Sequence, residues 1–319
     1  MKRPWALPLA PLYAAGALLR DAGLRVGLER TKKLRWPVIS VGSLSAGGAG
    51  KTPFVIALAG MLRARGVDVL SRGYGRSAKA AERVDPGGSA ERFGDEPLLI
   101  ARETGLPVFV GAWRFEAGLL AESQADGPGL HLLDDGFQHR QLARDLDIVL
   151  VSSEDLDDWL LPAGNLRESA RALRRASVLA VPSGDDAAVA RLRAIELRQP
   201  VWRFRRVMDA SGVQGRVLGF CGIARPGQFF AGLEAAGVFP VVRHIFPDHH
   251  RFSQDDVALL NRLAGGAAAQ AFVTTAKDHV RLGPLEAQLT LPVQVASLRI
   301  EIEDTANAVA WLERALGSA

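Results

Sequence analysis

The sequence predicts an α/β protein with a larger lobe, built on a mainly parallel sheet, and a second, smaller α/β lobe. In the larger lobe, short apolar runs alternate with segments of helical spacing; the runs are residues 67–70, 107–110, 132–135, 148–151 and 178–181. Alternation of this kind is typical of a parallel sheet covered by helices. A second alternation begins at residues 217–220, continues through residues 241, 271–275 and 291–295, and ends in a helix over residues 305–316.

We expect three segments along the chain. They are an N-terminal segment over residues 1–36, a first α/β domain over residues 37–200, and a second α/β domain over residues 201–319 that begins with an extended connector at 201–214. A length of 319 residues is consistent with two domains. The single cysteine, Cys221, excludes an internal disulfide framework and a cysteine-based zinc site, and it fits a reducing compartment.

The N-terminal segment is apolar and is then followed by basic residues. Residues 5–19 carry no charge, and Arg20, Arg25 and Arg30 come after them. Spanning a bilayer takes about 20 apolar residues, and this run is shorter and contains two prolines. The pattern favours a helix that lies in the surface of an anionic membrane, on its cytoplasmic side. A signal peptide, a core helix and a short true span are the alternatives.

The basic charge of the chain is concentrated at this N-terminus. The formal net charge is +4, and basic residues outnumber acidic ones mainly among residues 1–36. A nucleic-acid-binding protein shows a basic stripe on its folded domain. We therefore expect no nucleic-acid partner.

A glycine-rich turn follows the first predicted strand. Residues 37–41 are β-branched and apolar, residues 47–52 read GGAGKT, and helical spacing follows over residues 53–65. Strand, glycine-rich turn and helix are the context of a phosphate loop, in which backbone N–H groups and the helix N-terminus bind phosphates. Lys51 would reach the β- and γ-phosphates, and the Thr52 hydroxyl would bind Mg²⁺. The predicted ATP-binding set is Gly47, Gly48, Ala49, Gly50, Lys51 and Thr52.

The loop departs from the usual pattern at one position, because Ser45 stands where G-x-x-x-x-G-K-[ST] has its first glycine. A glycine-rich turn that binds nothing is the alternative interpretation. We expect a P-loop NTPase-like lobe with ATP and Mg²⁺ as cofactors.

Carboxylates occur at three further places. Asp134 and Asp135 end an apolar run, where a phosphate-loop protein has its Mg²⁺-binding aspartate, although they could be surface turn acids. Asp95 follows a glycine before a predicted helix, where it could be an N-cap. Residues 248–250 read Asp-His-His, which suggests either a metal cluster or a loop before a helix at Ser253.

An ordered series of motifs resembles one family, the tetraacyldisaccharide 4'-kinases, which are the lipid A kinases of Gram-negative bacteria. The motifs lie at residues 41–44, 47–53, 71–76, 94–97, 114–117, 134–140, 162–168, 246–250 and 274–278. The resemblance runs from about residue 5 to beyond residue 280. Ala49 and Ala276 replace a threonine and a glutamate that the family pattern would have.

The resemblance implies transfer of the ATP γ-phosphoryl group to the 4'-hydroxyl of a tetraacylated disaccharide 1-phosphate, which gives lipid IVA. It implies Asp95 as general base, tuned by His249 or His250, with His249 preferred, and Lys51 offsetting charge on the transferred group. Asp134 and Asp135 would hold Mg²⁺. The positions that match family residues near substrate or nucleotide are Tyr74, Arg114, Gln138, Asn165 and Arg167.

Other classes of function fit less well. A partitioning-type switch ATPase, the main alternative, carries a signature lysine where this chain has Ala46. A GTPase would place the lysine of residues 275–278 one position earlier, so adenine is favoured over guanine. A soluble kinase of a small sugar would not need the N-terminal apolar segment. We expect a monomer on the cytoplasmic side of the bacterial inner membrane.

Overall fold

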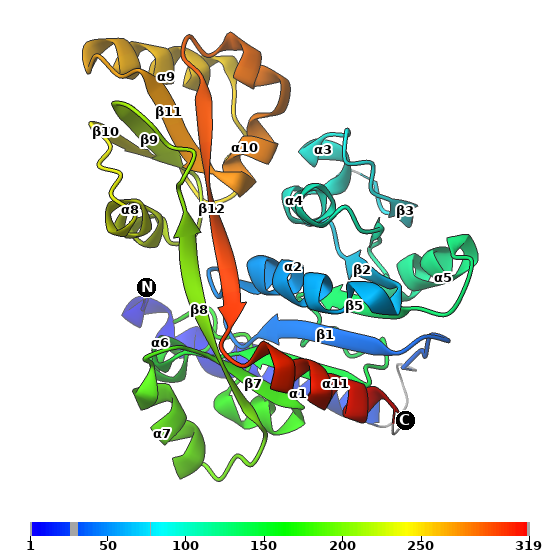
Figure 1. Ribbon diagram of the computed structural model, residues 1–319. Helices are drawn as coiled ribbons and strands as arrows, with labels where there is room; N and C mark the ends of the chain where they lie inside the picture. Colours follow the sequence, from blue (N-terminus) through cyan, green and yellow to red (C-terminus); the bar gives the residue numbers. More distant parts are fainter. Residues whose placement is uncertain (1, 26–30, 77, 318–319) are drawn as a thin grey trace.

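The computed structural model describes residues 2–25, 31–76 and 78–317, and within them twelve strands form one mixed sheet (Figure 1). The strand order is β10-β9-β11-β12-β8-β7-β6-β1-β5-β2-β4-β3. The predicted α/β class is therefore confirmed, and the sheet is continuous through both lobes.

Six strands of the first lobe run parallel, and a short seventh, β3 (Glu82–Arg83), pairs antiparallel at the edge. The six are β1 (Val38–Ser43), β2 (Val67–Ser71), β4 (Val108–Val110), β5 (Leu130–Asp134), β6 (Leu146–Leu150) and β7 (Val178–Pro182). All five apolar runs expected between residues 67 and 181 are strands. Because neighbouring parallel strands end on the same side, β1, β2 and β5 bring their carboxyl ends to one edge of the sheet.

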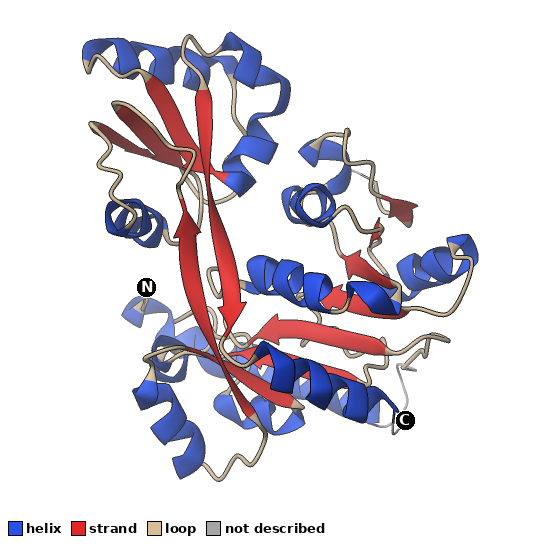
Figure 2. Cartoon of the chain, viewed as in Figure 1, coloured by secondary structure: helices blue, strands red, loops and turns tan. Residues whose placement is uncertain are grey.

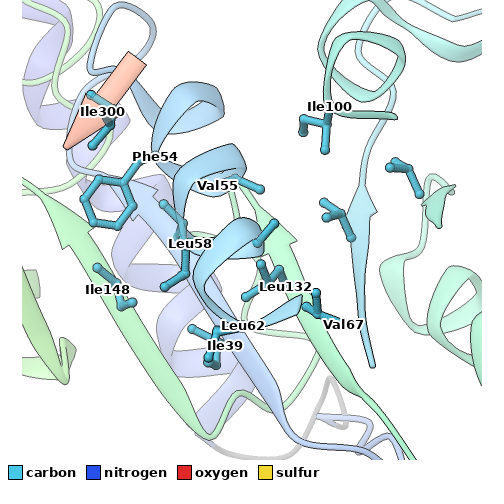
Figure 3. Close-up of a cluster of buried hydrophobic side chains, with 14 of the residues drawn as sticks. Ile39, Phe54, Val55, Leu58, Leu62, Val67, Ile100, Leu132, Ile148 and Ile300 are labelled. Atoms are coloured by element: carbon cyan, nitrogen blue, oxygen red, sulfur yellow. The ribbon is translucent and has the colours of Figure 1, made fainter. Parts of the chain in front are cut away.

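Helices cover both faces of this sheet (Figure 2). The longer ones are α2 (Lys51–Met61), α4 (Asp95–Thr104), α5 (Arg114–Gln124) and α7 (Asp186–Ala194), and the shorter ones are α3 (Ala90–Phe93), α6 (Ser153–Asp157), η2 (Arg63–Arg65) and η3 (Ala170–Arg175). Phe54 and Leu58 of α2, and Leu62 just after it, share the main core with Ile39 of β1 and with Leu132 and Ile148 of the flanking strands (Figure 3). Burying each such side chain stabilises the fold by about 1.5–3 kcal/mol, so this core fixes α2 on β1.

Two long antiparallel strands join the lobes, as Figure 2 shows. They are β8 (Val201–Asp209) and β12 (Val293–Ile302), which pair from Phe204↔Ile302 to Asp209↔Ser297. Most of the expected connector at 201–214 is thus strand β8. The second lobe adds β9 (Val217–Cys221), β10 (Val242–Ile245) and β11 (Ala271–Thr275), with helices α8 (Pro226–Ala235), α9 (Gln254–Gly266), α10 (Ala276–Leu282) and η4 (Gly283–Gln288).

The last helix, α11 (Thr305–Gly317), returns to the first lobe. Its buried Ala308, Leu312 and Leu316 belong to the same core as Phe54. Trp311 meets Trp202 of β8 edge to face at 5.8 Å. The helix that we expected to end the second α/β alternation therefore packs into the first lobe, since β12 carries the chain back before α11 begins.

The N-terminal segment forms η1 (Pro4–Leu9) and α1 (Ala10–Arg25). Trp5 is 77% exposed and Leu12 is 71% exposed. The segment is tied to the first lobe by the Arg3 N–H, which donates to the Ala163 carbonyl oxygen at 2.6 Å. Among the described residues, no helix combines the length and the apolar character needed to cross a membrane. Arg30, part of the predicted basic segment, lies outside the described residues.

Candidate active site

The predicted phosphate loop connects β1 to α2 as expected. Gly47, Gly48 and Gly50 have φ angles of 81°, 70° and 87°, in the left-handed region that favours glycine. The loop is held from the side by residues after β6: the Ala46 N–H donates to the Asn165 carbonyl oxygen at 2.8 Å, and the Arg167 N–H donates to the Leu44 carbonyl oxygen at 2.8 Å. This geometry leaves the α2 N-terminus available to an anion.

The second lobe contacts the same loop. The Arg206 guanidinium of β8 donates to the Ala49 carbonyl oxygen at 2.8 Å. Arg225, just before α8, packs so closely on Gly48 that a Cβ there would lie 2.6 Å from the Arg225 Nε. The backbone angle therefore favours glycine at position 48, and a larger residue there would also displace the Arg225 side chain.

Lys51 and Thr52 begin α2, directly below the loop. The Lys51 ammonium lies 3.3 Å from the Ser43 hydroxyl, at the end of β1, and 3.4 Å from Asp135 Oδ1. The Thr52 side chain is buried. Lys51 is thus placed among oxygen atoms at the carboxyl edge of the sheet, where a phosphate would compete for it.

The two adjacent carboxylates differ because the strand ends between them. Asp134 is the last residue of β5, and Asp135 has a φ angle of 50°, which turns its side chain toward Lys51 and Arg167. Burial, together with Glu96 and Asp135, raises the pKa of Asp134 to about 7. Burial would also raise the pKa of Asp135, but the charges of Lys51 and Arg167 outweigh it and lower that pKa.

The residues expected to hold Mg²⁺ fit that ion chemically. Asp134 Oδ1 is buried and has no hydrogen-bond partner, and the neighbouring strand β1 leads to the buried Thr52 hydroxyl. Across the described ranges, no three His, Cys, Asp or Glu side chains form a metal cluster. Mg²⁺ in nucleotide enzymes is usually held by one or two carboxylates and the phosphates themselves, so an all-protein cluster is not needed.

Asp95 and His249 are brought together from the two lobes. Asp95 is the first residue of α4, and the preceding Gly94 approaches Gly73 so closely that a Cβ on Gly94 would lie 3.0 Å from the Gly73 Cα. His249 Nδ1 lies 3.3 Å from Asp95 Oδ2. The other histidine of the pair, His250, bonds Asp256 at 2.9 Å instead.

Two cations of α10 reach the start of α4. Arg281 Nε donates to Asp95 Oδ2 at 2.7 Å, and Lys277 Nζ lies 2.6 Å from Glu96 Oε1. Burial alone would raise the pKa of Asp95, but the hydrogen bond with His249 and the charges of Arg281 and Lys277 hold that pKa well below its usual range. Asp95 is therefore an ionised carboxylate at neutral pH.

The expected substrate-binding residues fall into separate groups. Gln138 and Asp135 both accept from the Arg167 guanidinium, at 3.2 Å and 2.8 Å, so these positions form one network beside Lys51. Tyr74 is exposed, and its ring centroid lies 5.5 Å from that of His249. The Asn165 amide instead donates to Asp158 at 2.8 Å, so the structure does not bring its side chain to the others.

Arg114 is buried at the N-terminus of α5, and its Nε has no hydrogen-bond partner. Burial, together with the neighbouring charge of Arg72, lowers the pKa of Arg114 to about 10. A buried guanidinium with an unused donor is suited to an anionic ligand.

A cleft of about 850 Å³ runs between the lobes and past the phosphate loop. Its lining includes the loop, the start of α2, one side of α4 and of α10, the β8–β12 pair and α8. This volume lies in the range of nucleotide and drug-sized ligand sites. His249, Lys277 and Arg281 line it, so the residues that hold Asp95 and its neighbour Glu96 open onto the same space as the phosphate loop.

Sequence reasoning missed Glu96 and Arg281 as site residues. Arg281 lies four residues after Lys277, and this spacing places both cations on one face of a helix. That spacing was a usable signal. The partner of Arg281, however, lies 186 residues away, and only the fold reveals it.

Comparisons with known proteins point to one family. A family model described as Tetraacyldisaccharide-1-P 4'-kinase matches residues 3–317. The "Tetraacyldisaccharide 4'-kinase" of Koribacter versatilis is 44% identical over 310 residues, covering 93% of this chain and 94% of that protein. The protein of the same name from Syntrophus aciditrophicus is 38% identical, covering 95% and 91%. The crystal structure of LpxK from Aquifex aeolicus in complex with ATP superposes with a TM-score of 0.76 at 32% identity, covering 98% of each chain.

Proposed function

The chain belongs to the tetraacyldisaccharide-1-P 4'-kinase family, and we propose here how its own residues perform that reaction. It is an ATP-dependent kinase that phosphorylates the 4'-hydroxyl of tetraacyldisaccharide 1-phosphate to give lipid IVA, in lipid A biosynthesis. The observation that carries the assignment of roles is the buried Asp95, whose partners His249 and Arg281 line the cleft that also contains the phosphate loop.

The loop binds and orients ATP. Backbone N–H groups of the glycine-rich turn and the N-terminus of α2 face the phosphates, and Lys51 reaches the β- and γ-phosphates once it leaves Asp135. Thr52, Asp134 and Asp135 would hold Mg²⁺, which when bound neutralises charge on the phosphates. Asp134 fits this role because a nearby cation favours the ionised form of a carboxylate whose pKa burial has raised.

Asp95 acts as the general base. The 4'-oxygen of the sugar forms a bond to the γ-phosphorus, the bond from that phosphorus to the β–γ bridging oxygen breaks, and ADP leaves. The proton of the 4'-hydroxyl passes to the Asp95 carboxylate, and His249 stabilises that carboxylate through the contact at 3.3 Å. A placed base of this kind contributes about 10²–10⁴-fold to the rate.

Four further residues would contact the ligands. Arg114 and Arg167 supply positive charge near the transferred group, and Gln138 orients Arg167. Tyr74 would contact the disaccharide beside His249. A fifth residue, Asn165, would stand beside the loop, since its backbone carbonyl oxygen accepts from the Ala46 N–H. Its amide donates one hydrogen bond to Asp158 and keeps a second donor and its oxygen for a ligand.

Transfer of radiolabelled γ-phosphate from ATP to purified tetraacyldisaccharide 1-phosphate, in detergent with Mg²⁺, tests these roles. We expect Asp95→Ala to lower turnover by about 10²–10⁴-fold and to leave ATP binding largely intact. Asp126→Ala, which removes an exposed loop carboxylate, is the matched control and should behave as the wild type. Normal turnover by Asp95→Ala would exclude it as the base.

We also propose that η1 and the start of α1 lie in the cytoplasmic surface of the inner membrane. Trp5, Leu7, Leu9 and Leu12 are exposed apolar side chains, and the exposed Lys2 and Arg3 stand beside them. Such a face suits the interface of an anionic bilayer, where the acyl chains of the substrate also reside. The chain would act there as a monomer, which light scattering in detergent would check.

Flotation with vesicles that contain anionic lipid tests this placement. The wild type should float with the vesicles, and a Trp5→Ser/Leu12→Ser double variant should float several-fold less. Leu119→Ser, which removes an exposed leucine of α5, should float as the wild type does. Equal flotation of all three proteins would place the membrane contact elsewhere.

A further inference from the structure

The guanidinium group of Arg281 bonds residues of its own lobe through Nη1 and bonds Asp95 of the other lobe through Nε and Nη2. Its Nη1 donates to Asp278 Oδ1 at 2.9 Å and to the Gly222 carbonyl oxygen at 2.6 Å, both in its own lobe. Across the boundary, Nε lies 2.7 Å and Nη2 lies 2.5 Å from Asp95 Oδ2. The two side chains are 7% and 6% exposed, so this contact is shielded from water and salt.

The two oxygens of the Asp95 carboxylate are used unequally. Oδ2 accepts both donors of Arg281 and faces His249 Nδ1 at 3.3 Å. Oδ1 accepts the Glu96 N–H, at 2.9 Å. Each carboxylate oxygen has about two acceptor sites. Oδ1 therefore keeps capacity for one more hydrogen bond, whereas Oδ2 has none left.

We propose that Arg281 is a positioning residue for phosphoryl transfer: it occupies Asp95 Oδ2 from the second lobe, leaves Oδ1 to receive the acceptor proton, and keeps the carboxylate ionised while the lobes are in contact. This inference rests on the proposed role of Asp95 as general base. It makes the charge of the base depend on a residue of the other lobe.

Charged groups of both lobes act on Asp95: the hydrogen bond with His249 lowers its pKa most, and the charge of Arg281 comes next. From α10, Arg281 and Lys277 favour the carboxylate, and Asp278 opposes it. His249, in the loop before α9, favours it, and Glu96 on α4 itself opposes it. Removing one partner of a buried ion pair leaves the other charge uncompensated. Without Arg281, the pKa of Asp95 rises because burial, Glu96 and Asp278 are then opposed only by His249 and Lys277.

The pH dependence of kcat at saturating ATP and lipid separates this role from a structural one. For Arg281→Gln we expect the acid limb of the profile to move up by at least one pH unit, so that the loss relative to wild type grows as the pH falls. Arg281→Lys keeps the charge but not the planar donor pair. It should keep the acid limb near that of the wild type and lose about tenfold in kcat at every pH.

Arg251→Gln is the matched control. Arg251 also crosses the lobe boundary, with its Nη2 donating to the Gly75 carbonyl oxygen at 3.1 Å, and the same substitution removes the same charge. Arg251 is not among the residues that bond or act on Asp95, so the acid limb of Arg251→Gln should match that of the wild type. Thermal melting of each variant verifies that it is folded at the assay temperature.

Two results would overturn the inference. One is a uniform loss in Arg281→Gln at all pH values, and the other is an equal shift of the acid limb in Arg251→Gln. Either would mean that Arg281 only holds the lobes together. If Asp95→Ala keeps normal turnover, the base itself is misassigned. If Asp95→Ala loses turnover while Arg281→Gln keeps the wild-type profile, the role of Arg281 alone is wrong.

Discussion

The residues that receive the phosphates and those that hold the base differ in where they come from. Lys51 and Thr52 directly follow the glycines of their own loop, and the core beneath α2 fixes them on β1. Asp95 and Arg281 come from different lobes and meet 186 residues apart in sequence. The groups of the phosphate loop that would bind phosphate therefore all come from one lobe, although Arg206 and Arg225 contact that loop, whereas the base depends on contact between two lobes.

This difference predicts that substitutions in the two regions will affect different kinetic properties. A change in the phosphate loop should impair nucleotide binding and transfer together, at every pH and salt concentration. A change in the contacts between α10 and α4 should leave nucleotide binding intact and should alter how turnover responds to pH or salt. The variants below are ordered from the largest expected effect to the smallest.

Lys51→Ala should give the largest loss among these variants. Removing one preorganised donor to developing charge typically costs about 10²–10³-fold in kcat. Because Lys51 also binds the nucleotide, the KM for ATP should rise at the same time. Steady-state kinetics at several pH values measure both effects. Lys79→Ala, which removes an exposed lysine after β2, is the control and should behave as the wild type. If the loss in Lys51→Ala were confined to low pH, the expected difference between the two regions would be wrong.

Asp134→Asn should lower turnover on the order of 10²-fold and yet stabilise the nucleotide-free protein. At pH 8 the buried Asp134 is ionised above its raised pKa of about 7, which costs free energy that the neutral amide avoids. The sign follows from linkage: a carboxylate with a raised pKa destabilises the fold as pH rises through that range. A gain of about 1 kcal/mol would raise Tm by roughly 2 °C. Calorimetry at pH 5 and pH 8 checks this, since the gain should shrink at pH 5.

Lys277→Gln should have the smallest effect. Its ion pair with Glu96 is about a quarter exposed on both sides, and pairs of that kind contribute about 0–1 kcal/mol. We expect the kcat of Lys277→Gln to be about two- to fivefold lower than that of the wild type. Added salt, which screens the ion pair, should lower the kcat of the wild type and leave that of the variant unchanged. Titrating KCl in the kinase assay measures it. A larger loss than that of Arg281→Gln would invert the expected order.

Local features of the chain were predictable because they depend on neighbouring residues. The glycines of the loop, the strands that precede them and the helix that follows are determined by backbone angles and apolar spacing within a few residues. The runs at 67–70 and 178–181 are strands for the same reason. The resemblance to a known family supplied Asp95 and His249, which spacing alone could not have paired.

Long-range features were not predictable from local patterns. The helix at Thr305–Gly317 has an apolar face, but the sequence of that face does not predict the lobe against which the helix packs. Asn165 matches a family position, yet its amide is bonded to Asp158 through a local turn. Arg281 has helical spacing to Lys277, but its partner becomes visible only when α10 meets α4. These positions depend on the path of β8 and β12 between the lobes.

That path also constrains the order in which the protein can fold during synthesis. The first lobe contains both early residues of the chain and its last helix, since Leu312 and Leu316 of α11 share a core with Phe54 of α2. Because α11 follows the second lobe in the chain, the ribosome releases it after that lobe, and the larger lobe stays incomplete until then. The sequence of the second lobe lies between β8 and β12, so this lobe is synthesised completely before the first one. It can therefore fold before the first lobe is complete.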